Sequence, residues 1–388
     1  MEPTYKLHVG YHHQELLPYP PQGYEFVVNE GISDGLFKWI SRNPLSYKLT
    51  STISQLVPSV LIRAYIGRFI NHPPVGTHIT FSLNHLIFRK EPWVIEIDAT
   101  WDPIGPSVKY FKKYRGIMER AFASDYCKRV FCACEFSRQQ LISLVDCSGF
   151  EQKIDILPRA VHRKEFTKKI GGKKVRLFFL GSANLAGAFE MRGGKEVLEA
   201  FIVLNQKYKN LELVIRSDIF PAIREWYKEC LKMDNVTLID SVLPYSELEQ
   251  IYQSVDIFLI PSHFADWLVM MEAMSYELPV VATNVYAAPE YIDNGKTGFL
   301  ITPSRGVPYY DDGIPLLNMT SKFQKAIQKV DARVVTDLVD KTSILIENET
   351  MRIEMGKAGR WEIEHGRFSI ENRNAVFKRV FDEIAPRT

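Results

Sequence analysis

The chain of 388 residues lacks the sequence features that define several broad classes of protein. No segment contains the roughly 20 consecutive apolar residues that a membrane-spanning helix needs. The first residues, MEPTYKLHVGYHH, lack the charged and then apolar pattern of a secretory signal peptide. The 48 basic residues of the whole chain are balanced by 46 acidic residues, whereas a nucleic-acid-binding protein usually carries a stronger basic excess. We therefore expect a cytoplasmic protein with no nucleic-acid partner, and a peripheral position at the inner membrane face stays open.

Cysteine is scarce, and its spacing does not follow a metal-binding pattern. Only five cysteines occur, and four of them cluster without the paired Cys-x-x-Cys spacing of zinc sites: Cys127, Cys132, Cys134 and Cys147. Two of these lie in KRVFCACEFS, an apolar segment typical of a buried strand. We expect reduced thiols that pack in the core as small apolar side chains, and no protein-bound metal.

The residues from about 175 onward alternate between strand-like and helix-like segments. Short, continuously apolar strands are expected in KVRLFFLGSA, LELVIRS, NVTLIDSV, VDIFLIPS and LPVVATN. Helices are expected between them, in GKEVLEAFIVLNQKY, around 223–231, in SELEQIYQS from a serine cap, and in the segment around Met270. Apolar strands separated by helices are typical of a parallel sheet covered on both faces, and therefore of a doubly wound α/β domain.

The first half of the chain predicts a second α/β domain. Its candidate strands are YKLHVGYHH, YEFVVNE, THITFSL, EPWVIEID and KRVFCACE, and residues 56–70 and 108–123 have helical periodicity. The basic, glycine-containing segment 163–176 has the composition of a linker. We predict domains over residues 1–165 and 174–365. They are followed by a helical segment over 366–388, with an apolar stripe of Val376, Phe377, Val380 and Phe381.

The segment after the strand VDIFLIPS holds the main candidate site. In an open parallel sheet, ligands bind beyond the carboxyl ends of the strands, which places SHFAD at the site. Asp266 can cap the helix that follows, whose free N–H groups at Trp267 and Leu268 would attract a phosphate. Glu272 lies about one and a half turns further along and leans toward the helix N-terminus, so it can reach sugar hydroxyls of the same ligand. This predicts a nucleotide-like ligand; the alternative is that Glu272 points to solvent.

One long segment, VDIFLIPS…LVMMEAMSYELPVVATNVYAAPEYIDNGKTGFLITP, resembles the signature of the retaining, nucleotide-sugar-dependent glycosyltransferases of family 4 (group 1). Further segments are similar in order and spacing: FFLGSA, RGGKEVLEAF, LELVI, NVTLIDSVLPYSELEQIYQSVD, KIDILPRAVHRKEF and GRFSIENRNAVFKRVFDEI. The resemblance implies the GT-B fold, in which two Rossmann-like doubly wound domains face a central cleft. The domain over 1–165 would be the acceptor side, that over 174–365 would bind the nucleotide-sugar donor, and the last helix would cross back to the first domain.

The resemblance also implies roles for individual residues. Glu272 matches the glutamate that binds the ribose hydroxyls of the donor, and Arg192 occupies the position of a diphosphate-binding lysine, with Lys195 as a candidate second cation. An arginine keeps the charge and can bind phosphate through two N–H groups; a solvated loop charge is the alternative for Arg192. The loop SVLPYS matches the segment whose backbone contacts the base. The expected donor-binding residues are Gly181, Ser182, Arg216, Val242, Leu243, Phe264, Ala265, Trp267, Leu268 and Glu272.

The chain departs from the family pattern near the predicted donor sugar. The acid that the family carries in a Glu-x7-Glu spacing falls at Phe264, and Asp266 is the candidate for the displaced carboxylate. Asp98 takes the position of a histidine that faces the sugar from the acceptor side; it can serve there or simply end its strand. The glycine-rich loop after the first strand is replaced by HHQELLPYPPQG. Other replaced family positions are an arginine at Ser182, a helix-ending glycine at Glu277, and a glycine pair at Tyr286 and Ala287.

Together these matches imply a metal-independent hexosyl- or glycosyltransferase, which moves a sugar from a nucleotide-diphosphate sugar to a glycan, lipid-linked or other hydroxyl acceptor. No cofactor is expected, because cations would neutralise the departing diphosphate and the chain shows no Asp-x-Asp metal signature. The altered positions leave two alternatives: a catalytically impaired nucleotide-sugar-binding protein, or a nucleotide-sugar epimerase on the same fold. The expected catalytic residues are Asp98, Arg192, Lys195 and Asp266.

A basic segment indicates where an acceptor could be delivered. VKYFKKYRGIMERAFASDYCKR carries seven basic residues with tyrosines interleaved, which could rest on anionic lipid and present a lipid-linked acceptor. LVPSVLIRAYIGRFI is a second candidate. A solvated basic face and a core-facing helix are the alternatives for the two segments. Candidate residues lining the acceptor site are His12, His13 and His85.

Overall fold

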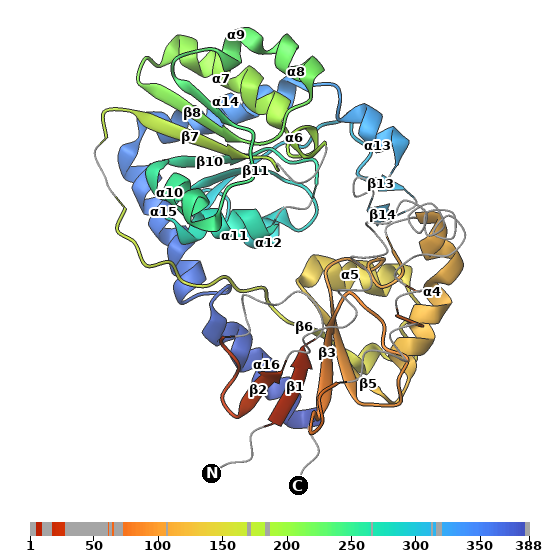
Figure 1. Cartoon of the computed structure of the whole chain (residues 1–388). Coiled ribbons are helices and arrows are strands. Elements are labelled where there is room, and N and C mark those ends of the chain that lie inside the picture. The colour runs from red at the N-terminus through yellow and green to blue at the C-terminus, as the bar shows by residue number, and fades with distance from the viewer. Residues whose placement is uncertain are drawn as a thin grey trace. The chain divides into compact units, whose positions relative to one another are not determined.

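The computed structural model describes residues 5–9, 18–27, 61, 64–65, 73–105, 108–168, 172–182, 187–264, 267–311, 313–315 and 320–384. The chain forms two compact units. The first comprises Met1–Ala160 together with Ile370–Thr388, and the second comprises Val161–Ser369. Both are α/β domains built on a parallel sheet (Figure 1).

The first unit is built on six parallel strands in the order β2-β1-β3-β4-β5-β6. The strands are β1 (Tyr5–Val9), β2 (Tyr24–Val27), β3 (Ile79–Leu83), β4 (Trp93–Ile97), β5 (Cys127–Cys132) and β6 (Ile154–Ile156). The helices are α4 (Val108–Ala123), α5 (Glu135–Leu144) and α16 (Ile370–Ile384). The five predicted strands of this half correspond to β1 to β5, whereas most of the predicted helix 56–70 lies outside the described residues.

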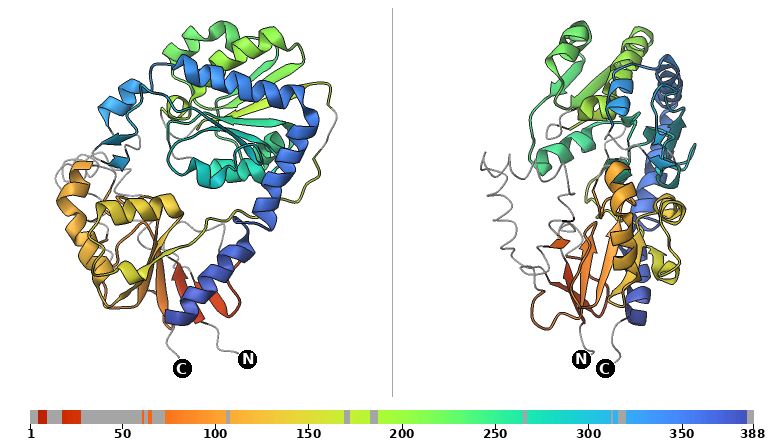
Figure 2. Two further views of the ribbon diagram at one scale, coloured as in Figure 1. Left: turned by 180° about the vertical axis from the view of Figure 1, so that it is seen from behind. Right: turned by 90° about the vertical axis from the view of Figure 1, so that its right-hand side faces the viewer.

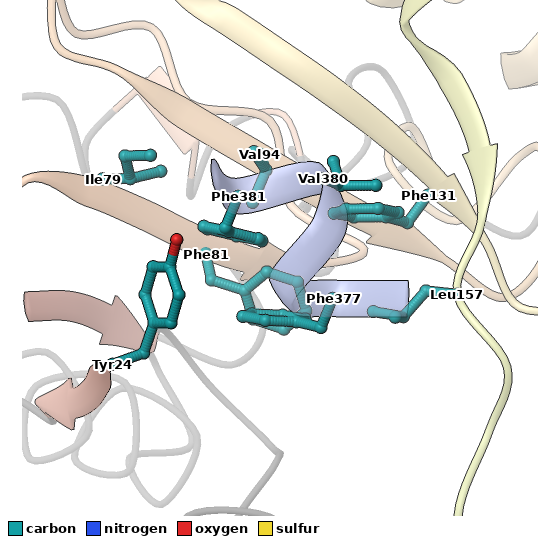
Figure 3. Close-up of a cluster of buried hydrophobic side chains, with 9 residues drawn as sticks. All are labelled: Tyr24, Ile79, Phe81, Val94, Phe131, Leu157, Phe377, Val380 and Phe381. Atoms are coloured by element: carbon teal, nitrogen blue, oxygen red, sulfur yellow. The ribbon is translucent and has the colours of Figure 1, made fainter. Parts of the chain in front are cut away.

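Helix α16 covers one face of this first sheet. Phe377, Val380 and Phe381 pack on side chains from β2, β3, β4 and β5, as Figure 3 shows. Trp93 of β4 contacts Phe122 of α4, while its neighbour Val94 packs in the α16 cluster. Because successive strand residues point to opposite faces, α4 and α16 lie on opposite faces of the sheet. The two faces are therefore closed by segments from distant parts of the sequence.

The second unit is built on six parallel strands in the order β12-β11-β10-β7-β8-β9. They are β7 (Val175–Leu180), β8 (Leu211–Arg216), β9 (Val236–Ile239), β10 (Ile257–Ile260), β11 (Val280–Thr283) and β12 (Gly298–Ile301). The strand order reverses between β7 and β10, which is the switch point where doubly wound sheets bind ligands. The predicted doubly wound α/β architecture is thus confirmed for this half of the chain.

The helices of the second unit cover both faces of its sheet (Figures 1 and 2). One side carries α6 (Ala188–Met191), α7 (Gly194–Lys207), α8 (Pro221–Trp226), α9 (Lys228–Leu231) and α14 (Ala332–Glu347). The other side carries α10 (Tyr245–Ser254), α11 (Trp267–Ser275), α12 (Ala288–Tyr291) and α15 (Glu349–Glu364). After β12 the chain adds a short hairpin, β13 (Tyr310–Asp311) with β14 (Ile314–Pro315), and α13 (Ser321–Ala326).

Two predicted helices differ in detail from the observed ones. The helix expected around 223–231 is two short helices, α8 and α9, separated by Tyr227. The expected serine cap of SELEQIYQS is wrong, because α10 begins one residue earlier, after Pro244, and its N-cap residue makes no side-chain capping bond. Proline sets its own backbone angle and is common beside a helix start, so it takes the place of the cap.

Candidate functional site

The site is built at the switch point, where the loops after β7 and β10 diverge. Gly181 follows β7 at a point of close contact, since a Cβ there would overlap the side chain of Ser217. Its backbone N–H donates to the carbonyl of Arg216, the last residue of β8, at 2.9 Å. Ser182 accepts a backbone hydrogen bond from Asp218 at 3.1 Å. These bonds hold the carboxyl ends of β7 and β8 tightly together.

Arg192 folds back onto the end of β7. It follows the short helix α6, and its Nη1 donates to the carbonyl oxygens of Leu180 and Gly181 at 3.3 and 2.5 Å. The guanidinium is partly buried, so it is not a freely solvated loop charge. Gly193 adopts the left-handed conformation and lies against Pro261, whose backbone a Cβ would overlap. Arg192 is therefore fixed between the loops that follow β7 and β10.

Arg216 brings a second guanidinium to the same place. It ends β8 opposite Leu180 in register, and 9% of its surface is exposed. Burial, and then the charge of Arg192, lower the pKa of Arg216. Neither its Nε nor the hydroxyl of the fully buried Tyr252 has a hydrogen-bond partner within the described residues. Two cations and two unused donors thus converge at the ends of β7 and β8.

Glu272 belongs to the neighbouring helix α11 and is already engaged. The hydroxyl of Tyr245 donates to its Oε1, and the ammonium of Lys164 lies 3.4 Å from the same oxygen. Lys164 also donates to the Tyr245 hydroxyl at 2.6 Å. The side chains of Lys164 and Glu272 are 14% and 15% exposed, so the carboxylate does not simply point to solvent. Burial raises the pKa of the fully buried Tyr252, and this side chain lies close enough to Glu272 and to both arginines for their charges to influence that pKa.

The prediction of a second site cation at Lys195 requires correction. Lys195 is 1% exposed, and its Nζ donates to the backbone carbonyl and the side-chain oxygen of Gln328 at 2.6 and 3.3 Å. Burial lowers its pKa. The physical reason is the left-handed Gly193, which separates α6 from α7, so Arg192 and Lys195 do not share one helical face. The second cation beside Arg192 is Arg216.

The loop after β10 packs against the segment that carries Arg192. The N–H of His263 donates to the carbonyl of Met191 at 2.8 Å, and Ser262 Oγ donates to the same carbonyl at 3.3 Å. Phe264 is partly buried and its N–H donates to Ser262 Oγ at 3.0 Å. The predicted site residues Ala265 and Asp266 lie outside the described residues.

The remaining predicted donor residues lie at the edges of this region. Trp267 begins α11 and stacks on Tyr291, with ring centroids 6.0 Å apart, while the neighbouring Leu268 is exposed. Val242 is exposed in the loop before α10, beside the partly buried Leu243. The structure therefore brings Arg192, Arg216 and Glu272 to one place. It adds Lys164, Tyr245 and Tyr252, which sequence reasoning did not assign, although Tyr245 belongs to the quoted SVLPYS loop.

Asp98 lies in the first unit, in an ionic cluster at the end of β4. Its carboxylate contacts the guanidinium of Arg159 and accepts from Asn84 Nδ2 at 3.1 Å. Its own N–H donates back to Asn84 Oδ1 at 3.0 Å. Arg159 also pairs with the buried Glu96 at 3.3 Å. These bonds give Asp98 a clear role in ending its strand, which was one of its two predicted alternatives.

The candidate acceptor-side features are only partly described. His85 Nδ1 lies 2.6 Å from the carbonyl of Leu83, whereas His12 and His13 lie outside the described residues. Five basic side chains are exposed on α4: Lys109, Lys112, Lys113, Arg115 and Arg120. No described helix combines the length and the hydrophobicity needed to span a bilayer. The described residues also contain no cluster of three or more metal-ligating side chains.

The cysteines are buried thiols. All five are free and buried. Burial raises the pKa of Cys127 to about 12 and that of Cys147 to about 11. Protonated, inaccessible thiols are poor metal ligands and poor nucleophiles, in keeping with the predicted core role.

Parts of this chain are similar to known proteins. Residues 174–311 match the family model of glycosyl transferases group 1. The capsular polysaccharide biosynthesis glycosyltransferase CapM of Staphylococcus aureus is 25% identical over 178 residues, which are 45% of this chain and 38% of that protein. The sulfoquinovosyl transferase SQD2 of Arabidopsis thaliana is 34% identical over 122 residues, which are 30% of this chain and 18% of that protein. The chain thus spans well under two thirds of the length of these curated relatives.

Solved structures share the fold along almost the whole chain. A glycosyltransferase from Rickettsia africae superposes with a TM-score of 0.59 at 15% identity, covering 99% of this chain and all of that one. The Anabaena protein HepE, solved with UDP and glucose, superposes with a TM-score of 0.57 at 12% identity, covering 98% and 100%. Residues 174–311 are therefore similar to a glycosyl transferases group 1 domain, in a chain of two Rossmann-like units that shares its fold with GT-B glycosyltransferases.

Proposed function

We propose that this chain is a retaining glycosyltransferase of family 4, which transfers a sugar from a nucleotide-diphosphate sugar to a hydroxyl of a glycan or lipid-linked acceptor. The observation that carries the proposal is the pair of guanidiniums, Arg192 and Arg216, at the ends of β7 and β8 beside the unpartnered hydroxyl of Tyr252. The group 1 match over the same strands supports it.

The arginine pair is well suited to a diphosphate. Two like charges close together repel each other, and burial removes the water that would otherwise screen them. A diphosphate would neutralise both and could accept from the unused Nε of Arg216 and the hydroxyl of Tyr252. The ribose hydroxyls of the same nucleotide would bind Glu272. They would replace the contacts that Tyr245 and Lys164 make with its carboxylate.

Catalysis would come from stabilising the departing diphosphate. Charge builds up on the leaving group as the bond to the sugar breaks, and cations held in place before the reaction stabilise that charge. Arg192 and Arg216 would supply this stabilisation in a metal-independent reaction, with no cofactor other than the nucleotide sugar as co-substrate. Asp98 is not proposed as a catalytic group, because its carboxylate is held by Arg159 and Asn84.

The acceptor side belongs to the same proposal. The exposed basic side chains of α4 would rest on an anionic membrane surface at its cytoplasmic face. The neighbouring tyrosines Tyr110 and Tyr114, with centroids 6.1 Å apart, would lie at that interface. A lipid-linked acceptor would then reach the enzyme from the membrane plane.

The experiment combines binding with turnover. Titration calorimetry with UDP, GDP and dTDP identifies the nucleotide, and release of nucleoside diphosphate from the matching sugar donors is then followed with and without acceptors. Arg216→Ala and Arg192→Ala should each lower turnover at least tenfold at saturating donor, since they act on the leaving group. Arg379→Ala, which removes an exposed arginine of α16, is the matched control and should leave turnover unchanged.

The same experiment separates the alternatives. The contacts of Tyr245 and Lys164 with Glu272 favour a second candidate, a nucleotide-sugar-binding protein with impaired catalysis. Binding without release under any acceptor would support that candidate. Epimerised nucleotide sugar without transfer would indicate an epimerase, and full turnover in Arg192→Ala and Arg216→Ala would overturn the assigned site.

A further inference from the structure

Three loops at the carboxyl end of the second sheet are joined through Tyr309. The hydroxyl of Tyr286, in the loop after β11, donates to the carbonyl of Tyr309 at 3.0 Å. The hydroxyl of Tyr309, in the segment after β12, lies 3.3 Å from Nδ1 of His263 in the loop after β10. The ring of Tyr286 meets those of Tyr309 and Tyr310 edge to face, with centroids 5.8 and 5.7 Å apart. We call these three tyrosines the aromatic wall.

The aromatic wall is anchored to the segment that carries Arg192. His263 is fully buried between Tyr309 and Glu196 of α7, whose Oε1 lies 3.3 Å from its Nε2. The N–H of His263 donates to Met191, the residue before Arg192. Tyr309 also packs on a small apolar cluster that α6, α13 with its C-cap residue, and the segment after β12 form together: Ala188, Met191, Val307, Phe323 and Ile327. The wall therefore stands beside the arginine pair, on the α6 and α7 side.

The order of groups along the site follows from these positions. Glu272 faces α10 and Lys164, on the opposite side of the sheet from α7 (Figure 1). A nucleotide sugar is a linear molecule in which the diphosphate joins the nucleoside to the sugar. With the ribose at Glu272 and the diphosphate at Arg192 and Arg216, the transferred sugar extends toward the aromatic wall.

Two of the three wall tyrosines, Tyr286 and Tyr309, offer ring surface rather than a hydroxyl, and the third, Tyr310, is 48% exposed and carries its hydroxyl. The hydroxyls of Tyr286 and Tyr309 are used within the cluster, and the partly buried Phe264 beside His263 has none. The backbone of Tyr286 is left-handed, with φ of +48°, a conformation that is rare for a bulky residue. Such local strain is typical of ligand-contacting positions. A glycine would adopt this backbone without strain, whereas the tyrosine brings a ring to this position at a cost in backbone strain.

We propose that the aromatic wall contacts the transferred sugar and selects a deoxy sugar over the matching hexose. This inference rests on the proposed function. A sugar hydroxyl placed against ring surfaces loses its water and gains no partner, whereas a hydrogen or methyl group at the same position gains apolar contact. The difference should amount to about tenfold in affinity for each hydroxyl that is placed there.

The test compares matched donors on the whole chain. Affinities are measured for UDP, GDP and dTDP, and for UDP-galactose against UDP-6-deoxygalactose, GDP-mannose against GDP-6-deoxymannose, and dTDP-glucose against dTDP-6-deoxyglucose. For the nucleotide that binds, the 6-deoxy donor should bind about tenfold tighter than its hexose. A hexose that binds as tightly as its deoxy partner overturns the inference while leaving the proposed function intact. No binding of any nucleoside diphosphate overturns both.

Variants show whether the wall causes this preference. Tyr310→Ala removes a ring that is 48% exposed, and Tyr286→Gly suits the left-handed backbone, so both should fold. Each should reduce the deoxy preference to about twofold or less, and the affinity for the free nucleoside diphosphate should stay within about twofold of the parent. Trp226→Ala removes an exposed ring of α8 and should change neither value. An unchanged preference in both wall variants overturns the inference.

Discussion

The ammonium group of Lys164 lies 3.4 Å from Oε1 of Glu272. Lys164 belongs to the segment that enters the second unit, where Arg360 of α15 donates to its carbonyl at 3.1 Å. Its ammonium also lies over the rings of Tyr245 and Tyr276, 4.8 and 5.8 Å from their centroids. Glu272 is therefore held in a preformed polar cluster, and a ribose bound as proposed would replace contacts that already exist.

The first prediction concerns Tyr245, whose hydroxyl donates to Glu272 and would compete with the proposed ribose for that carboxylate. Tyr245→Phe should raise the affinity for the nucleoside diphosphate about fivefold, roughly 1 kcal/mol, because the ligand no longer displaces this hydrogen bond. Titration calorimetry measures the change. Tyr227→Phe is the matched control, since the Tyr227 hydroxyl donates instead to Glu199 at 2.9 Å. Weaker binding in Tyr245→Phe would mean that the hydroxyl contacts the nucleotide itself.

The second prediction concerns Arg216 in the absence of ligand. Arg216→Met removes a buried cation that is repelled by Arg192, so it should stabilise the unliganded protein by about 1 kcal/mol while weakening nucleotide binding. Thermal unfolding with and without nucleoside diphosphate measures both effects. Arg224→Met, which removes a half-buried guanidinium paired with Asp240 at 3.0 Å, should give no such gain. A destabilised Arg216→Met protein would show that the guanidinium has a structural role.

The third prediction concerns Asp102, which follows β4 in the first unit and accepts from the N–H of Ala99 at 3.0 Å. Burial raises the pKa of Asp102 to about 6, and the Ala99 hydrogen bond opposes this only in part. Because the folded chain holds this proton more tightly than the unfolded chain, folding loses stability as the pH rises from about 4 to about 6.

Asp102→Asn should remove that loss, since an amide oxygen can accept the same N–H without titrating. We expect the variant to be more stable than the parent by about 3 kcal/mol near pH 7 and equal to it near pH 4. Urea unfolding, with hydrogen exchange of β4 as the probe, measures the difference. Asp125→Asn, at an exposed position, is the control. An equal difference at both pH values would contradict the titration.

The fourth prediction concerns the packing of α16. Phe377 is fully buried, stacks on Phe381 with centroids 4.1 Å apart, and lies against Phe131 (Figure 3). Phe377→Ala should destabilise the first unit by about 3–5 kcal/mol, because it leaves a cavity in the core. Hydrogen exchange of β3 and β5 should report the loss, whereas strands of the second unit should be unaffected. The exposed change Arg379→Ala on the same helix should have little effect.

Much of the fold could be predicted because apolar periodicity reports burial directly. The strands β7, β8 and β10 to β12 are short and mostly buried, and all but β12, which falls in the quoted family segment, were expected from their continuous apolar runs. The β13–β14 hairpin was not predicted, since two-residue strands have no periodicity. The split between α8 and α9 at Tyr227 was also missed, because the apolar pattern continues across it.

The site was predictable only where a residue type and its neighbours determined its position. Arg192 and Glu272 were proposed from their motifs, and their roles stay predictions. The direction of Lys195 depends on the left-handed Gly193, which a single sequence does not reveal. Lys164 approaches Glu272 only through tertiary packing across the unit. Asp98 was left between two roles, and its partner Arg159 comes from a segment far along the chain.

The first unit combines two chain segments, Met1–Ala160 and Ile370–Thr388, which precede and follow the second unit in the sequence. During synthesis, Val161–Ser369 is a continuous stretch that can fold as soon as it has emerged. The α16 side of the first unit's sheet lacks the packing of Phe377, Val380 and Phe381 until these residues have been synthesised. The N-terminal unit is therefore expected to complete its fold last and to be the part of the nascent chain that most needs protection from aggregation.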